Sequence, residues 1–154
     1  MIETPRLTTT AAQPIAYIEL KATWDNIQSV MHDGLDELRS VLQAQGIAQT
    51  GPWFTHHFRR PEASFHYEMC FPVSTPVRPV GRVQRGTTPS LRVVRTIYHG
   101  GYDQLGEGWG EFCEWIGRSG LSVRDDLYEA YLVGMETGDD ASKYRTELTC
   151  PLKP

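Results

Sequence analysis

Apolar side chains recur every three or four positions in two segments of the chain, a period typical of amphipathic helices. The first segment covers residues 27–45 and is followed by Gly46, a residue type common just past a helix C-terminus. The second covers residues 103–118, with Gly120 just beyond it. The pattern therefore predicts two helices. The apolar face of the second contains Leu105, Trp109, Phe112, Cys113 and Ile116.

Short runs rich in β-branched and aromatic residues surround both predicted helices, as expected of strands. One run precedes each helix and two runs follow it. The predicted strands cover residues 15–20, 52–58 and 64–71 around the first helix, and 91–98, 126–134 and 143–150 around the second. The order strand, helix, strand, strand therefore occurs twice, which indicates a duplicated βαββ unit.

The duplication is also visible in individual residues. Glu68 is followed four positions later by Pro72, and Glu147 is followed four positions later by Pro151. These two pairs are 79 residues apart, at the end of the same predicted strand in each unit. We expect one domain over residues 13–153, with repeats at 13–75 and 91–153, a linker at 76–90 and a short extra strand at 80–83.

Two such units contain many strands and only two helices, so each helix leaves part of a sheet face to be covered. We therefore expect an α+β fold in which tandem βαββ modules form a curved antiparallel sheet. A hollow between the two helices would then be the natural place for a ligand.

Composition narrows the function classes. The 154 residues carry a formal net charge of -4, which disfavours non-specific binding to nucleic acid. No apolar run approaches the roughly 20 residues of a membrane span, and the polar N-terminus lacks a secretory signal. The three cysteines are odd in number and form no CxxC pair, so we expect a cytoplasmic protein without disulfides.

One carboxylate lies in an apolar setting. Strand alternation places Leu127, Glu129, Tyr131 and Val133 on one face. Burial of an unpaired carboxylate costs several kcal/mol, so such a group requires a cation, a hydrogen-bond network or a cationic ligand. The alternative is that Glu129 points to solvent from a half-exposed sheet, and spacing alone does not choose between the two.

Aromatic residues are the second candidate feature. Tyr67, Trp53, Trp109, Tyr131 and Tyr144 lie in or beside the predicted strands and the second helix. Rings together with one carboxylate suit a flat or cationic organic ligand, since stacking and cation–π contacts each contribute about 0.5–2 kcal/mol. The alternative is that these rings are ordinary core residues.

The histidines and cysteines do not form a metal-binding pattern. His56 and His57 are adjacent, so in a strand they face opposite ways, which favours surface or capping roles. The sequence predicts neither a metal site nor a cofactor.

The segment HGGYDQLGEGWGEFCEWI (99–116) resembles the signature H-x-G-x-Y-x-x-L-x-x-x-W of the GyrI-like small-molecule-binding family. That family includes the effector-binding domains of AraC-type and MerR-type multidrug regulators. The resemblance continues through LYEAYLV (127–133) and YRTELTCPL (144–152), with YEMCFPV (67–73) as the earlier copy. It covers roughly residues 13–153.

The resemblance implies tandem SHS2-type modules with a ligand groove at their junction. In multidrug-binding members a glutamate in a Tyr-Glu context faces cationic aromatic ligands, and Glu129 after Tyr128 matches that position. Tyr131, Trp109 and Tyr144 are the candidates for the aromatic walls. Only about a dozen residues precede the first predicted strand, too few for the helix-turn-helix domain of the regulators, so we expect a stand-alone pocket protein.

Three functions follow from this resemblance. The first is a cytoplasmic binding protein for small organic molecules that are hydrophobic and often cationic. The second is a hydrolase of cyclopropane-bearing DNA-alkylating compounds, in which Glu129 acts as general base and Tyr131 or Tyr144 orients the electrophile. The third, which the family name suggests, is modulation of DNA gyrase, and the slight acidity makes it the least favoured. Whether the protein is an enzyme stays open at this point.

Overall fold

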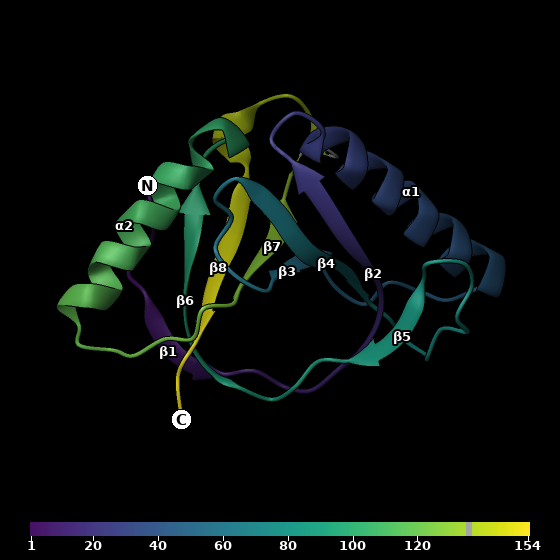
Figure 1. Ribbon diagram of the computed structural model, residues 1–154, viewed down its shortest axis with the longest axis horizontal. Helices are drawn as coiled ribbons and strands as arrows, with labels where there is room; N and C mark the ends of the chain where they lie inside the picture. The colour runs from purple at the N-terminus through teal and green to yellow at the C-terminus, as the bar shows by residue number, and fades with distance from the viewer. Residues whose placement is uncertain (135–136) are drawn as a thin grey trace. The chain divides into compact units, whose positions relative to one another are not determined.

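The computed structural model describes residues 1–134 and 137–154 and divides them into two compact units. One unit contains residues 11–90, and the other contains residues 1–10 together with 91–154. Each unit consists of four antiparallel strands and one long helix (Figure 1). In the described part of the chain, no helix is both long and apolar enough to cross a membrane.

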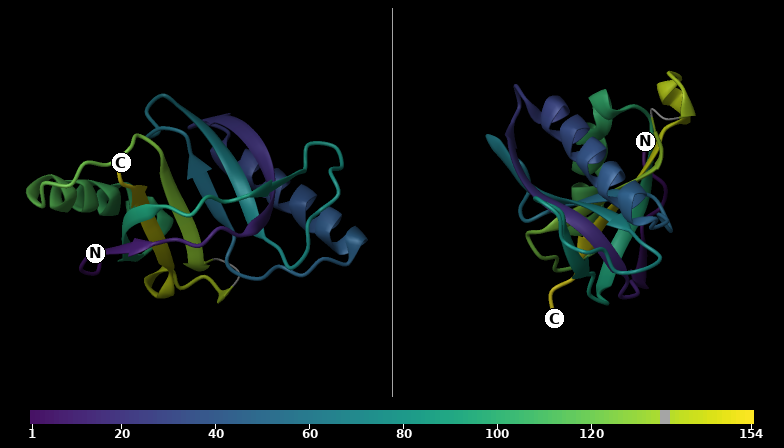
Figure 2. Two further views of the ribbon diagram at one scale, coloured as in Figure 1. Left: turned by 90° about the horizontal axis from the view of Figure 1, so that it is seen from below. Right: turned by 90° about the vertical axis from the view of Figure 1, so that its right-hand side faces the viewer.

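The unit of residues 11–90 has its strands in the order β3-β4-β2-β5. Its elements are β2 (Pro14–Thr23), α1 (Ile27–Gln45), β3 (Phe54–His57), β4 (Ser64–Pro72) and β5 (Gln84–Thr87). Helix α1 runs along one face of these strands, as both views of Figure 2 show. Gly46 ends the helix in the left-handed conformation, as its position predicts.

The other unit has its strands in the order β1-β6-β8-β7. Its elements are β1 (Arg6–Thr9), β6 (Arg92–His99), the short 3₁₀ turn η1 (Tyr102–Gln104), α2 (Leu105–Arg118), β7 (Leu127–Val133), the 3₁₀ turn η3 (Ala141–Lys143) and β8 (Arg145–Pro151). The predicted α+β class and the twofold βαββ order are confirmed.

Two short strands differ from the sequence-based expectation. β1 was not predicted, because its four residues are mostly exposed and carry no alternating pattern, yet it pairs with β6 over its whole length. The strand predicted at 80–83 is a tight turn closed by a single bridge between Val80 and Val83. The extra strand of that unit, β5, begins directly after the turn.

Each helix approaches its sheet closely at a buried glycine. In α1, a Cβ on Gly34 would come within 3.1 Å of Leu20 Cδ1. In α2, a Cβ on Gly108 would overlap the ring of Tyr98 in β6. A glycine inside a helix costs about 1 kcal/mol relative to alanine, so these two positions are explained by close helix–sheet packing rather than by helix propensity.

The core of each unit lies between its helix and its sheet. Leu38 of α1 packs with Tyr67 and Phe71 of β4 in one unit, and Phe112 of α2 packs with Leu148 of β8 in the other. Leu127 of β7 belongs to the core beneath α2. Because side chains alternate along a strand, Glu129 and Tyr131 of β7 face the same side as Leu127, toward α2.

Candidate functional site

The carboxylate of Glu129 is held by two neutral hydrogen-bond donors. Trp109 of α2 donates its indole Nε1–H to Glu129 Oε2 at 2.6 Å. Tyr131, two residues along β7, donates its hydroxyl to Glu129 Oε1 at 2.7 Å. Glu129 is half-buried, so it faces neither bulk water nor a closed core. The side chain of Glu129 therefore does not point into bulk solvent, which was the alternative left open by the sequence.

The charge of this carboxylate is not balanced by a basic side chain. Among the described residues, no Lys, Arg or His lies within 4 Å of the carboxylate oxygens of Glu129. Hydrogen bonds to a charged acceptor contribute about 1.5–3 kcal/mol each, and Glu129 accepts two of them. The result is a carboxylate held in one position between an indole and a phenol.

Three tyrosine rings lie together beside this group. The ring of Tyr102 in η1 is 6.1 Å from that of Tyr131, edge-on at 81°, and 5.3 Å from that of Tyr144. Tyr144 is itself fixed, because its hydroxyl donates to the backbone oxygen of Gly138 at 2.7 Å. Tyr102 is one of the exposed large aromatic residues, so the cluster is open to solvent at that side chain.

Local structure explains why these residues meet. Gly108 lets α2 approach β6 closely, and Trp109 follows it directly, so its indole reaches the sheet. The pairing of β7 with β8 shifts register just after Tyr131, and such irregularities are frequent beside functional sites. Thr146, the β8 residue opposite Tyr131, has a fully buried hydroxyl with no hydrogen-bond partner among the residues described.

The predicted site residues fall into both units. Glu129, Trp109, Tyr131 and Tyr144 lie in the unit that contains α2, and Tyr67 and Trp53 lie in the unit that contains α1. Tyr67 is fully buried in β4, where burial raises its pKa to about 12. Trp53 is half-buried and packs against the core of the same unit.

One buried pair was missed by the sequence-based interpretation. Thr55 Oγ1 and His57 Nε2 of β3 are hydrogen-bonded at 3.1 Å, and the His57 ring is stacked on that of Tyr67 at 5.2 Å. The expectation of a surface role is wrong for His57, which is almost fully buried. It is buried because β3 presents one of its two adjacent histidines to the side covered by α1.

The register of the two sheets identifies this pair as the duplicate of Glu129 and Tyr131. Glu129 pairs with Leu148, the residue after Glu147. Thr55 pairs with Met69, the residue after Glu68. The two glutamates mark the same place in the repeat, but Thr55 and Glu129 lie at different distances from them along the chain, so the match of Thr55 to Glu129 needed the strand register.

Comparison of the sequence with known families gives one match. The GyrI-like small molecule binding domain matches residues 3–153. No curated protein matches the chain.

Solved structures share the fold at low sequence identity. The C-terminal domain of EcmrR superposes with a TM-score of 0.88 at 19% identity, over 97% of this chain and 97% of that one. This protein also matches the EcmrR chain in the EcmrR–DNA complex, at 18% identity and with a TM-score of 0.87. It spans only 57% of the length of that EcmrR chain.

Two further structures are more distant. SAV2435 bound to tetraphenylphosphonium has a TM-score of 0.70 at 15% identity, covering 98% of this chain and 94% of that one. A hydrolase encoded by lin2189 from Listeria innocua has a TM-score of 0.68 at 11% identity, covering 97% of this chain and 91% of that one. At these identities the likeness establishes the fold alone.

Proposed function

We propose that this chain, which belongs to the GyrI-like small-molecule-binding family, binds hydrophobic aromatic cations through Glu129 and the rings beside it. Binding of a small molecule follows from the family.

The observation that carries the proposal is the environment of Glu129. Its carboxylate is half-buried, accepts only neutral donors from Trp109 and Tyr131, and has no basic partner among the described side chains. Partial burial of an unbalanced charge is costly, and a bound cation would offset that cost. The bound tetraphenylphosphonium of SAV2435, a lipophilic aromatic cation, is consistent with a ligand of this class.

The aromatic side chains supply the second part of the recognition. Trp109 and Tyr131 contact the carboxylate directly, and the ring of Tyr102 lies 6.1 Å from that of Tyr131. Each stacking or cation–π contact contributes about 0.5–2 kcal/mol. Micromolar affinity requires about 8 kcal/mol. A few such contacts together with one partly desolvated ion pair reach that magnitude.

Calorimetric titration with tetraphenylphosphonium and with a planar cationic dye tests the proposal. We expect Glu129→Gln to weaken binding at least tenfold. The matched control is Glu114→Gln, which removes the same charge from an exposed position of α2 and should leave the affinity unchanged. Equal affinities for wild type and Glu129→Gln would remove Glu129 from the mechanism.

A second candidate function uses the same pair of residues. Glu129 and the Tyr131 hydroxyl are 2.7 Å apart, so a carboxylate that can accept a proton lies beside a phenol that can orient an electrophile. Hydrolysis of a cyclopropane-bearing DNA-alkylating compound would draw on both. Incubation of such a compound with a tenth of its molar amount of protein separates the two functions. Conversion of all the compound requires turnover by the protein. Removal of only one molecule of compound per molecule of protein indicates binding without turnover.

A further inference from the structure

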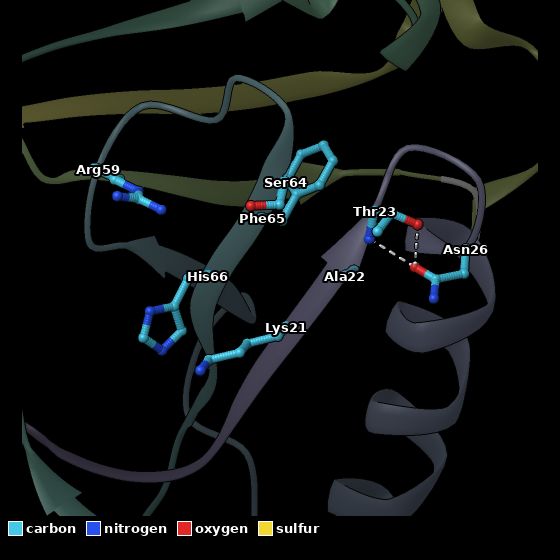
Figure 3. A pocket seen from close by; sticks show the side chains of 8 residues that line it. All are labelled: Lys21, Ala22, Thr23, Asn26, Arg59, Ser64, Phe65 and His66. Atoms are coloured by element: carbon cyan, nitrogen blue, oxygen red, sulfur yellow. Dashed lines mark hydrogen bonds between the residues drawn. The ribbon is translucent and has the colours of Figure 1, made fainter.

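A hollow of about 400 Å³ opens in the unit of residues 11–90, where β2 ends and β4 begins (Figure 3). Its basic lining residues are Lys21, Arg59 and His66, and its lining contains no aspartate or glutamate. The whole chain has more acidic residues than basic ones, 19 against 15. A lining with basic but no acidic residues is therefore a local departure from the composition of the protein.

Two of these positive charges are uncompensated. Within residues 1–134 and 137–154, neither Lys21 nor Arg59 forms an ion pair. Glu19 lies on the same strand face as Lys21, but its Oε2 is bonded to His66 Nε2 at 3.0 Å. In the described part of the chain, Lys21 and Arg59 are therefore the two cationic side chains of the hollow without a carboxylate partner.

Neutral donors complete the lining. Asn26 Oδ1 accepts hydrogen bonds from the backbone N–H of Thr23 at 2.7 Å and from its hydroxyl at 3.2 Å, drawn as dashed lines in Figure 3. The amide oxygen is therefore occupied, and the Nδ2 group is the end of Asn26 that can still donate. Ser64, opposite Thr23 in the β2–β4 ladder, adds a hydroxyl.

The two walls of the hollow are tied together. Trp24, in the turn after β2, donates its indole Nε1–H to the backbone oxygen of Glu62 at 2.6 Å. Its ring packs edge-on against Phe65 at 4.6 Å, and Phe65 lines the hollow. The contact links the turn that carries Asn26 to the loop that carries Arg59.

We propose that this hollow is a second ligand site, which binds small organic acids with the oxyanion between Lys21 and Arg59. The site is separate from the proposed cation site, because all its residues belong to the unit that lacks Glu129. Its ligand has the opposite charge. An organic carboxylate and an organic phosphate offer the same oxyanion, so both are tested.

Nuclear magnetic resonance titration of the ¹⁵N-labelled full chain tests the proposal with benzoate and phenyl phosphate as probes. We expect shifts of the backbone amides of residues 21–26 and 59–66, saturating in the millimolar range or below. The tighter of the two probes identifies the favoured oxyanion. Benzamide, the neutral analogue of benzoate, should bind with at most a tenth of the affinity of benzoate. Glu129→Gln should leave benzoate binding unchanged.

The matched variants remove two positive charges each. Lys21→Gln with Arg59→Gln should weaken benzoate binding at least fivefold. Arg85→Gln with Arg92→Gln, two exposed positions outside the hollow, should not. The spectrum of each variant reports its fold in the same measurement. The proposal is overturned if benzoate leaves these amides unshifted in the wild type or if both double variants bind equally.

Discussion

Glu129 in β7 and Thr55 in β3 occupy the same position in the two copies of the βαββ unit. Each is hydrogen-bonded to the residue two places further along its strand. The helices differ at the matching place, because Trp109 follows the buried Gly108 of α2 whereas Leu35 follows the buried Gly34 of α1. Only one copy therefore has an indole donor for a carboxylate.

This difference predicts that the two positions are not exchangeable. Thr55→Glu would place a carboxylate in a fully buried position, in the copy whose helix has no indole at the matching place, which we expect to cost about 3 kcal/mol or more. Thr55→Val keeps the shape and should cost only about 1 kcal/mol. Urea denaturation gives both free energies of unfolding, and equal losses would show that the carboxylate finds a donor there.

Removal of the indole donor should destabilise the unit that contains α2. Trp109→Phe retains an aromatic ring and loses the hydrogen bond to Glu129 Oε2. We expect the free energy of unfolding to fall by about 1–2 kcal/mol more than in Trp115→Phe. Trp115 lies on the same helix and packs against the same core. A smaller loss in Trp109→Phe than in Trp115→Phe would contradict a stabilising role for the bond.

Substitution of glycine by alanine in α2 should change the stability of the protein in opposite directions at different positions. A methyl group at Gly108 would overlap the Tyr98 ring. Gly108→Ala should therefore lower the free energy of unfolding, measured by urea denaturation, by about 1–3 kcal/mol. Gly106 and Gly117 have open space around the same position, and their alanine variants should gain up to about 1 kcal/mol from helix propensity. Stabilisation by Gly108→Ala would show that α2 does not pack closely against β6.

Alkaline pH should reveal the burial of Tyr67. Its pKa is raised to about 12 by burial, whereas an unfolded chain ionises tyrosine near pH 10. Between these values the folded state binds the extra proton, so stability present below pH 10 is lost as the pH rises toward 12, at up to about 1.4 kcal/mol per pH unit.

Tyr67→Phe should remove this share of the alkaline loss. At neutral pH the variant should be as stable as wild type or slightly more so, because the Tyr67 hydroxyl is buried without a hydrogen-bond partner among the described residues. Tyr144→Phe is the contrast, since it loses the bond to Gly138 and should cost about 1 kcal/mol at neutral pH. Urea unfolding at pH 8 and pH 11 measures both.

The regular part of the fold was predictable from local patterns. The three- and four-residue spacing identified α1 and α2, and the Glu-to-Pro spacing at Glu68 and Glu147 identified the repeat. Strand alternation also placed Glu129 and Tyr131 on one face, and the Tyr131–Glu129 hydrogen bond is consistent with that placement. These features depend on one element at a time, so one sequence is enough to read them.

Contacts between elements were not predictable in the same way. That Trp109 reaches Glu129 depends on the distance between α2 and β7, which Gly108 sets by its contact with Tyr98. The hollow around Lys21 and Arg59 joins a strand to a loop nearly forty positions further along. The spacing of residues within one segment predicts neither the contact between Trp109 and Glu129 nor the approach of Arg59 to Lys21.

One tryptophan in each unit lies near a proposed ligand site, and the two differ in solvent exposure, so ligand binding should change the tryptophan fluorescence. Trp24 beside the hollow is 62% exposed, whereas Trp109 beside Glu129 is only 8% exposed. An indole in water emits at longer wavelength than a buried one, so the two contribute different parts of the emission spectrum. In a variant that keeps only these two of the chain's four tryptophans, a cation at Glu129 should quench the short-wavelength part and an acid in the hollow the long-wavelength part, which allows both occupancies to be followed in one sample without a label.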